Sequence, residues 1–181
     1  MYPGNLQHAA HILKQGGIIA YATEYCFGLG CDPRNRNAVL RLLRLKQRPM
    51  KKGLIVLATD PEQLASYIKN IPTLVSASWP GPHTWLLIPQ PGIPKWITGR
   101  HAKIAARITA HAQARALCQT TGIAIVSTSA NRAGEIPART DREVARRFGR
   151  HVDYILRGCV GTAHAPTPIR DAATGKLMRA G

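Results

Sequence analysis

The stretch "GGIIAYATEYCFGLG", residues 16–30, decides how the chain folds. Two glycines end the helical pattern before it, and "GIIAYAT", residues 17–23, is apolar until it reaches a hydroxyl. A short apolar run bounded by glycine is typical of a buried strand. Thr23 and Glu24 follow, and we expect a glycine-bearing turn after them. Ligands gather beyond the carboxyl ends of strands in α/β sheets, so Thr23 is a candidate binding residue, although an ordinary strand exit has the same pattern.

The apolar pattern alternates between helical and strand periods along the chain. Spacing and capping signals predict helices over residues 5–16, 36–47, 60–68 and 111–122, and a last helix from Thr140, where "TDRE" has the form of a capping box. Strands are predicted at residues 17–23, 53–58, 83–89, 103–108, 122–128 and 152–156. Some strands follow one another without a helix between them. We therefore expect an α/β fold with a mixed sheet, in a single domain over residues 1–181.

The chain is strongly basic, with 25 Lys and Arg against 9 Asp and Glu and a formal net charge of +16. A phosphate-bearing partner is the natural inference, and a merely soluble basic surface is the alternative. The longest apolar runs fall far short of the roughly 20 residues that span a bilayer, and the N-terminal stretch has no signal-peptide core. We expect a cytoplasmic protein that does not enter a membrane.

Metal-binding and common nucleotide-binding motifs are missing from the sequence. The four cysteines form no C-x-x-C pair, the seven histidines form no H-E-x-x-H motif, and the acids are scattered. We expect reduced cysteines and no transition metal held by the protein. The P-loop and nucleophile-elbow signatures are absent, and "GLGCDP" is a weak dinucleotide signal.

The segment "RNRNAVLRLLRLKQRPMKK", residues 34–52, holds eight Lys or Arg and no acid. On a helix, Lys46 falls on the same line as Val39 and Leu42, so it points toward the core. Arg48 precedes Pro49 and is biased away from helical geometry. Together the two cations can hold one polyphosphate, or Lys46 can extend to solvent at the end of an apolar stripe. Periodicity alone does not separate a site from a solvated face.

Three other stretches place polar side chains where strands end or are interrupted. "VSTSANRAG", residues 126–134, follows an apolar strand with hydroxyls and an amide, and it fits either a turn or a site. Arg107 interrupts the apolar strand "AARIT", where a cation is costly unless it is paired or faces a ligand. Thr167 and Arg179 lie near the C-terminus. No single stretch decides the function.

Taken in order, these stretches resemble the YrdC/TsaC family, the threonylcarbamoyl-AMP synthases, over essentially the whole chain. The resemblance rests on "GGIIAYATEYCFGLGCD", "LLRLKQRPMKKGLIVLA", "WPGPHTWLLIP", "AARIT", "VSTSANRAG" and "PTPIRDAATGKLMRAG". It implies an open twisted sheet with flanking helices and a basic concave face. It also implies synthesis of threonylcarbamoyl-AMP from L-threonine, bicarbonate or CO2 and ATP, with release of pyrophosphate. The product would serve modification of tRNA next to the anticodon, through the threonylcarbamoyl-transferase machinery.

The same resemblance implies roles for nine residues. Lys46 and Arg48 would be catalytic and hold the ATP phosphates. The threonine-binding residues would be Thr23, Arg107, Ser129 and Thr167. The remaining ATP-binding residues would be Asn131, Thr140 and Arg179, although the capping box explains Thr140 equally well. Mg²⁺ would arrive with ATP, held by phosphates and water.

Departures from the family pattern and competing functions remain open. Ala22 replaces a proline, Ala133 replaces a serine, Thr167 stands where serine is usual, and Leu57 lies near a position that holds a threonine-contacting histidine in some members. Ser127 and Thr128 stay undecided between cleft wall and strand. A basic module that binds tRNA or double-stranded RNA without adenylate-forming activity is the main alternative. A carbamoyl-transfer enzyme acting on another acceptor is a further one.

Overall fold

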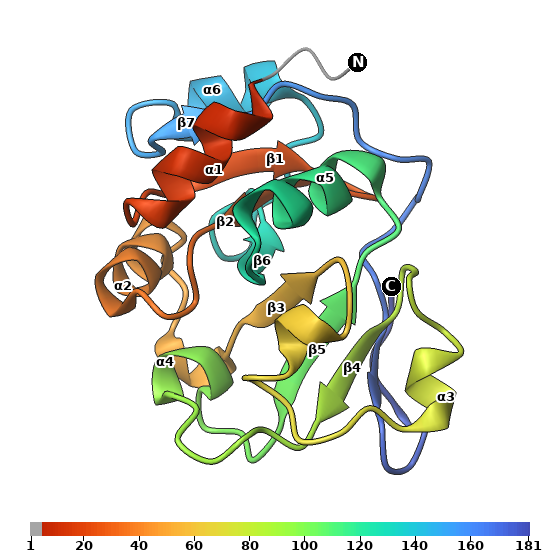
Figure 1. Cartoon of the computed structure of the whole chain (residues 1–181). Coiled ribbons are helices and arrows are strands. Elements are labelled where there is room, and N and C mark those ends of the chain that lie inside the picture. The colour runs from red at the N-terminus through yellow and green to blue at the C-terminus, as the bar shows by residue number, and fades with distance from the viewer. Residues whose placement is uncertain (1–4) are drawn as a thin grey trace.

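The computed structural model describes residues 5–181 and centres on one mixed sheet (Figure 1). The strand order in these residues is β7-β1-β2-β6-β3-β5-β4-β8-β9. The strands are β1 (Ile19–Ala22), β2 (Phe27–Gly30), β3 (Ile55–Ala58), β4 (Thr84–Leu87), β5 (Ile104–Ile108), β6 (Ile125–Ser129), β7 (Tyr154–Ile155), β8 (Ile169–Asp171) and β9 (Leu177–Arg179). The pairs β1/β7, β3/β5 and β4/β8 are parallel and the other neighbours are antiparallel. The predicted mixed sheet is confirmed.

Four longer helices begin at side-chain caps, as the sequence predicts for α1 and α6. They are α1 (Leu6–Lys14), α2 (Arg36–Leu45), α5 (Ala112–Thr121) and α6 (Asp141–Phe148). Asn5 and Asn35 accept from backbone amides of the first turns of α1 and α2, and His111 does the same for α5. Each cap satisfies an amide that has no partner inside its helix. Shorter helices are α3 (Thr73–Ser76), α4 (Lys95–Thr98), and the 3-10 turns η1 (Met50–Lys52) and η2 (Glu62–Leu64).

The helix predicted over residues 60–68 is wrong except for its first turn. Asp60 caps that turn by accepting from the Gln63 amide at 2.9 Å, and only η2 follows. The chain then leaves helical geometry because the Lys69 amide donates to Ile88 and the Gln90 amide donates to Tyr67. These bonds to a distant segment replace the ones that a longer helix would make.

The turn predicted after Glu24 is also shorter than expected, because residues 27–30 form strand β2. Ladder bonds join this strand to β1 on one side and to β6 on the other. Its two glycines leave room for neighbouring side chains: a Cβ at Gly30 would lie 2.6 Å from the Val126 carbonyl oxygen and 2.9 Å from the Tyr21 ring. Here glycine permits close packing within a strand. The sequence alone does not distinguish such a glycine from one in a turn.

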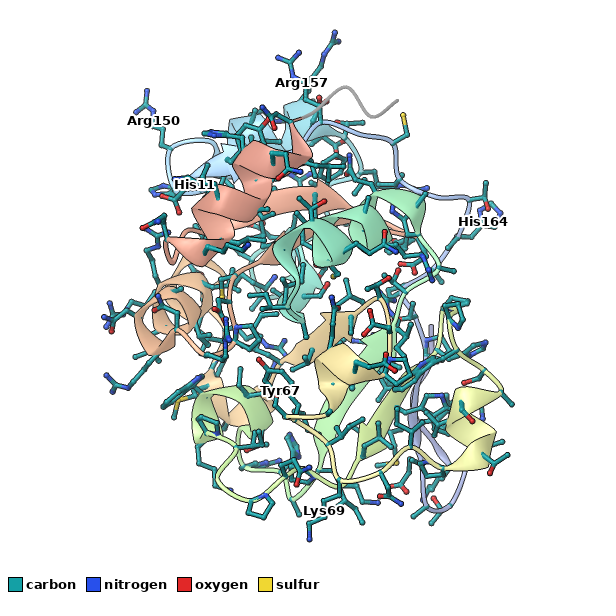
Figure 2. All side chains as sticks on the ribbon, in the orientation of Figure 1. His11, Tyr67, Lys69, Arg150, Arg157 and His164 are labelled. Atoms are coloured by element: carbon teal, nitrogen blue, oxygen red, sulfur yellow. The ribbon has the colours of Figure 1, made fainter. Side chains whose placement is uncertain are left out.

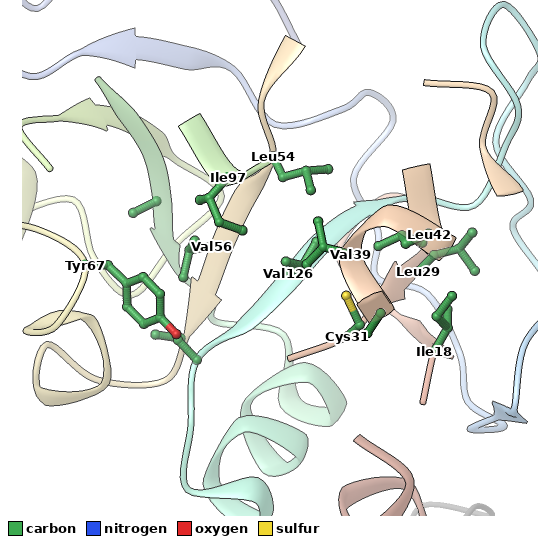
Figure 3. Close-up of a cluster of buried hydrophobic side chains, with 14 of the residues drawn as sticks. Ile18, Leu29, Cys31, Val39, Leu42, Leu54, Val56, Tyr67, Ile97 and Val126 are labelled. Carbon is green, nitrogen blue, oxygen red and sulfur yellow. The ribbon is translucent and has the colours of Figure 1, made fainter. Parts of the chain in front are cut away.

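Alternate residues of the central strands fill two cores, one on each face of the sheet. Leu57 and Ile125 pack with α1 and α5, which lie side by side over one face (Figure 1). Val56 and Val126 point the other way, into the core that α2, α4 and α6 cover. Figure 3 shows this second core, with side chains of α2 meeting those of β2 and β6. This alternation is the period of two expected for a sheet buried on both faces.

Many of the basic side chains project from the rim of the molecule. Figure 2 shows Arg150, Arg157 and Lys69 pointing outward, and all three are exposed. Within residues 5–181 no helix has the length and apolar character needed to cross a membrane.

Candidate functional site

A cleft opens on the α1/α5 face of the sheet, beyond the region that these helices cover. Its empty volume is about 780 Å³, counting the part open to solvent. Ser127 on β6 lies opposite Ile55 on β3, and Leu57 lies opposite Arg107 on β5. Because opposite residues point to the same face, Ser127, Ile55 and Arg107 share one side of the sheet. All three line the cleft, so neighbouring strands build its floor.

Arg107 is the charged centre of the floor, and Glu24 is its partner. One guanidinium nitrogen of Arg107 lies 3.2 Å from Glu24 Oε2, and the two side chains are only 7% and 13% exposed. Glu24 Oε1 accepts from the Thr109 hydroxyl at 2.6 Å. Among residues 5–181, nothing accepts a hydrogen bond from the buried Arg107 Nε. The ion pair fixes one end of the guanidinium and leaves donor capacity for a ligand.

Arg48 and Arg179 add two further guanidinium groups to the cleft wall. Gln47 takes a left-handed φ of 50°, which turns the chain after α2, so Arg48 lies on the cleft rather than on the outer face of the helix. Arg48 donates to the Gly53 carbonyl at 2.8 Å, and Arg179 donates to the Thr167 carbonyl at 2.8 Å. Burial, followed by the neighbouring Arg179 charge, lowers the pKa of Arg48. Burial, followed by Arg107, lowers the pKa of Arg179. The three cations repel one another, which favours binding of an anion between them.

Lys46 is buried, as its position on the apolar line predicts, and it does not line this cleft. Its ammonium donates to the carbonyl oxygens of Ser129 and Asn131, the latter at 2.7 Å. Burial, followed by the charge of Arg48, lowers the pKa of Lys46 to about 8. Lys46 therefore stabilises the end of β6 through backbone carbonyls, without lining the cleft itself. Its predicted phosphate contact stays a prediction.

The segment after β6 is a tightly bonded loop. Ser129 lines the cleft, and its hydroxyl donates to Asn131 Oδ1 at 2.6 Å. The Asn131 amide donates to the carbonyls of Arg132 and Glu135 at 2.8 and 2.9 Å, and Asn131 is not part of the cleft lining. Gly134 has a φ of 85°, the left-handed geometry that glycine adopts without strain. The stretch at 126–134 is thus both a wall of the cleft and a turn.

The remaining predicted residues divide between the cleft and other positions. Thr23 lines the cleft, and its hydroxyl donates to the Cys26 carbonyl at 2.7 Å. Thr167 also lines it, with its hydroxyl 3.2 Å from that of Thr84. Thr140 is exposed outside the cleft lining and accepts from the Glu143 amide at 3.1 Å. Glu143 in turn accepts from the amide of Arg139, the residue before the cap, so Thr140 caps α6 as predicted and the return bond lies one residue earlier than in a standard capping box.

Sequence reasoning missed the pairing of Glu24 and a second, adjoining cleft. Strand position draws attention to Glu24 together with Thr23, but no local signal pairs Glu24 with Arg107. The second cleft has about 800 Å³ of empty volume and shares Arg48 and Arg179 with the first. Lys52, His101 and Lys103 line it as well. No apolar period marks these three residues, because they lie outside or at the ends of strands and helices.

Two departures from the family pattern have local structural explanations. The Ala22 amide donates to Gln113 Oε1 at 2.9 Å, a bond that proline could not make, and this bond holds the strand end. Leu57 is fully buried in the α1/α5 core. Ala133 is exposed and donates its amide to the Lys46 carbonyl, a bond that serine would make as well, so nothing in the structure explains this substitution. Ser127 and Thr128 both line the cleft.

The described residues do not suit a protein-held metal. Among residues 5–181 no group of three or more His, Cys, Asp or Glu side chains is arranged to bind an ion. Glu24 is the one carboxylate among the residues lining the first cleft, and it is engaged by Arg107 and Thr109.

Known proteins resemble this chain over nearly its full length. The family model Sua5_yciO_yrdC, described as "Telomere recombination", matches residues 11–181. The threonylcarbamoyl-AMP synthase of Halorhodospira halophila is 48% identical over 181 residues, which cover 98% of this chain and 95% of the relative. The threonylcarbamoyl-AMP synthase of Coxiella burnetii strain RSA 493 is 44% identical over 182 residues, covering 98% of each.

Solved structures share the fold. P. abyssi Sua5 complexed with L-threonine matches with a TM-score of 0.87 and 30% identity over 95% of this chain. The match covers 52% of that protein, so this chain spans about half its length. E. coli YciO matches with a TM-score of 0.84 and 25% identity, over 97% of this chain and 88% of that one. These similarities confirm the predicted α/β fold class, and the chain belongs to the Sua5/YciO/YrdC family.

Proposed function

We propose that this chain is a threonylcarbamoyl-AMP synthase, which joins L-threonine, bicarbonate or CO2 and ATP and releases pyrophosphate. The observation that carries the proposal is the convergence of Arg48, Arg107 and Arg179 with the hydroxyls of Thr23 and Ser129 on one cleft. Three guanidinium groups suit an amino-acid carboxylate and a polyphosphate together. The two relatives named above carry the name of this activity and are nearly the same length as this chain.

The threonine would bind at the floor of the cleft. Arg107 would meet the threonine carboxylate with donors that Glu24 leaves free. Thr23 and Ser129 each donate their hydroxyl proton within the protein, so their oxygen lone pairs remain for a substrate N–H or O–H group. Thr167 lies at the C-terminal side of the same cleft.

The nucleotide would lie across the two adjoining clefts. Arg48 and Arg179 line both, so they would hold phosphates at the junction, with Lys52 and Lys103 further along. ATP would enter as its magnesium complex, with the ion held by phosphates and water. Lys46 would keep Ser129 and Asn131 in place through their carbonyl oxygens, and its charge would add to the positive potential near the phosphates.

The chemistry then requires mainly positioning and charge. Threonine's neutral amine adds to CO2 and loses a proton to give a carbamate, a carbamate oxygen attacks the α-phosphorus, and pyrophosphate leaves. Negative charge accumulates on phosphate oxygens, where fixed guanidinium donors stabilise it. Holding carbamate and phosphate in one cleft supplies much of the rate by proximity.

We also propose partners for the product. The adenylate would pass to a threonylcarbamoyl-transferase acting on tRNA, and the exposed arginines would suit a nucleic acid. Such a reaction belongs in the cytoplasm.

Pyrophosphate release tests the proposal. The wild-type chain should release pyrophosphate only when ATP, bicarbonate and threonine are all present. Arg107→Met should raise the KM for threonine by about tenfold to a hundredfold, the worth of a charged hydrogen bond. Arg100→Met, which removes an exposed arginine outside both cleft linings, is the matched control and should change nothing. Release that does not depend on threonine would rule the proposal out.

A further inference from the structure

The side chain of Tyr21 crosses one strand to reach the cleft wall. Tyr21 lies on β1 and is fully buried, and β2 separates β1 from β6. A Cβ at Gly28 would lie 3.3 Å from the Tyr21 ring, and one at Gly30 would lie 2.9 Å from it. Because these two positions of β2 lack side chains, the ring lies over the strand. Its hydroxyl donates to Ser127 Oγ on β6 at 2.8 Å.

Tyr21 is a permanent proton donor in this pair. Burial raises the pKa of Tyr21 well above its ordinary value, so the phenol keeps its proton at any physiological pH. In the part of the chain that the structure describes, Ser127 Oγ is the one hydrogen-bond partner of the phenol. Rotating the O–H away would leave a buried proton without an acceptor, which costs about 1–3 kcal/mol.

This bond decides what Ser127 can offer to a ligand. A serine hydroxyl has one proton and accepts through its lone pairs. Since Ser127 accepts from Tyr21, its own proton is left to donate, and within residues 5–181 no protein group accepts it. Ser127 lines the cleft, so the proton is available to whatever binds there. Anionic oxygens are the strongest acceptors for such a donor.

Ser127 and Arg107 flank the same strand. β6 and β5 lie on either side of β3, and both side chains point to the cleft face. A carboxylate held by Arg107 therefore lies on the same face of the sheet as the Ser127 hydroxyl.

We propose that Ser127 donates a hydrogen bond to the carboxylate of bound threonine, and that Tyr21 is the positioning residue that holds Ser127 in the donor state. The inference rests on the proposed function, because it assumes that threonine occupies the floor of the cleft. It assigns a substrate contact to Ser127 and a reason for the glycine pair of β2.

Threonine binding in the absence of ATP tests the inference by calorimetry. Ser127→Ala should weaken threonine binding by about tenfold, as expected for loss of a hydrogen bond to a charged group. Tyr21→Phe should weaken it by a smaller factor, and should have no further effect when Ser127 is already alanine. In the pyrophosphate-release assay the KM for threonine should rise by the same factors. Each variant deletes one oxygen and adds no atom, so both should fold, and thermal melting checks this.

Tyr67→Phe is the control for removing the hydroxyl group of a buried tyrosine. Tyr67 is 6% exposed and belongs to the other core, away from the cleft lining. It should leave threonine binding unchanged. Wild-type affinity in Ser127→Ala would overturn the assignment of Ser127. A Tyr21→Phe effect of equal size in both backgrounds would overturn the role of Tyr21, since packing alone would then explain it. If the wild type itself binds no threonine, the proposed function fails as well.

Discussion

The guanidinium of Arg107 lies 3.2 Å from the carboxylate of Glu24, and both side chains are nearly enclosed at the floor of the cleft. Glu24 comes from the segment after β1 and Arg107 from β5, so the pair joins two distant parts of the sheet. Removing either partner leaves the other charge buried without compensation. Removing both leaves no unpaired charge of this pair.

Glu24→Gln should therefore lower the free energy of unfolding by about 3 kcal/mol, and Arg107→Met by a similar amount. The double variant should lose clearly less than the sum of the two, because no unpaired charge remains. Urea denaturation of the four proteins measures this coupling. Losses that simply add would mean that the two charges do not stabilise each other.

Alkaline pH should reveal the buried Lys46. Its pKa is about 8 in the folded chain and 10.5 ordinarily. Between these values the unfolded chain holds the proton and the folded chain does not, so unfolding takes up a proton and stability from this residue rises with pH. The cost of charging Lys46 in the fold is fully present below pH 8 and disappears toward pH 10.5.

The comparison with Lys46→Met isolates this effect from the titration of cysteines and tyrosines, which both proteins share. Between pH 8 and pH 10 the stability of the wild type relative to Lys46→Met should rise by about 1–3 kcal/mol in urea denaturation. A difference that stays constant across this range would show that Lys46 keeps its ordinary pKa.

Thr140→Ala separates the two roles considered for this residue. As the cap of α6, Thr140 should contribute about 1 kcal/mol to stability. The KM for ATP should not change, because the side chain lies outside the cleft lining. Thr140→Ser should restore stability. A raised KM for ATP with unaltered stability would favour a nucleotide contact instead.

Gly30→Ala should destabilise the chain more than Gly28→Ala. A methyl group at residue 30 would approach the Val126 carbonyl oxygen to 2.6 Å, whereas at residue 28 its closest contact is 3.2 Å, to the Thr23 side chain. We expect a loss of about 1–3 kcal/mol for Gly30→Ala, typical of overpacking. Thermal melting of both variants provides the comparison, and equal melting temperatures would contradict this account of β2.

Local signals predicted what local interactions determine. Asn5 and Thr140 cap helices where the sequence places them, and the alternation of Val56 with Leu57 follows directly from an apolar run. The burial of Lys46 also followed from helical periodicity. Its acceptors did not, because they come from the end of β6 and the loop after it, more than eighty residues later.

The misses have a common cause in long-range contacts. Residues 27–30 form a strand because β1 and β6 pair with it, and β8 and β9 form through a ladder that starts at β4. Leu177 and Met178 of β9 are 46% and 55% exposed, and no apolar alternation marks this strand. The partnership of Glu24 with Arg107 likewise depends on how distant strands are ordered, which propensity does not encode.

The direct test of the central claim is to supply ATP, L-threonine and carbon-13 bicarbonate to the purified chain and analyse the nucleotide products by mass spectrometry. The cleft predicts an adenylate that carries both threonine and the labelled carbon, formed in step with pyrophosphate and lost in Arg48→Ala. ATP cleavage without threonine, or an adenylate without the labelled carbon, would contradict the account.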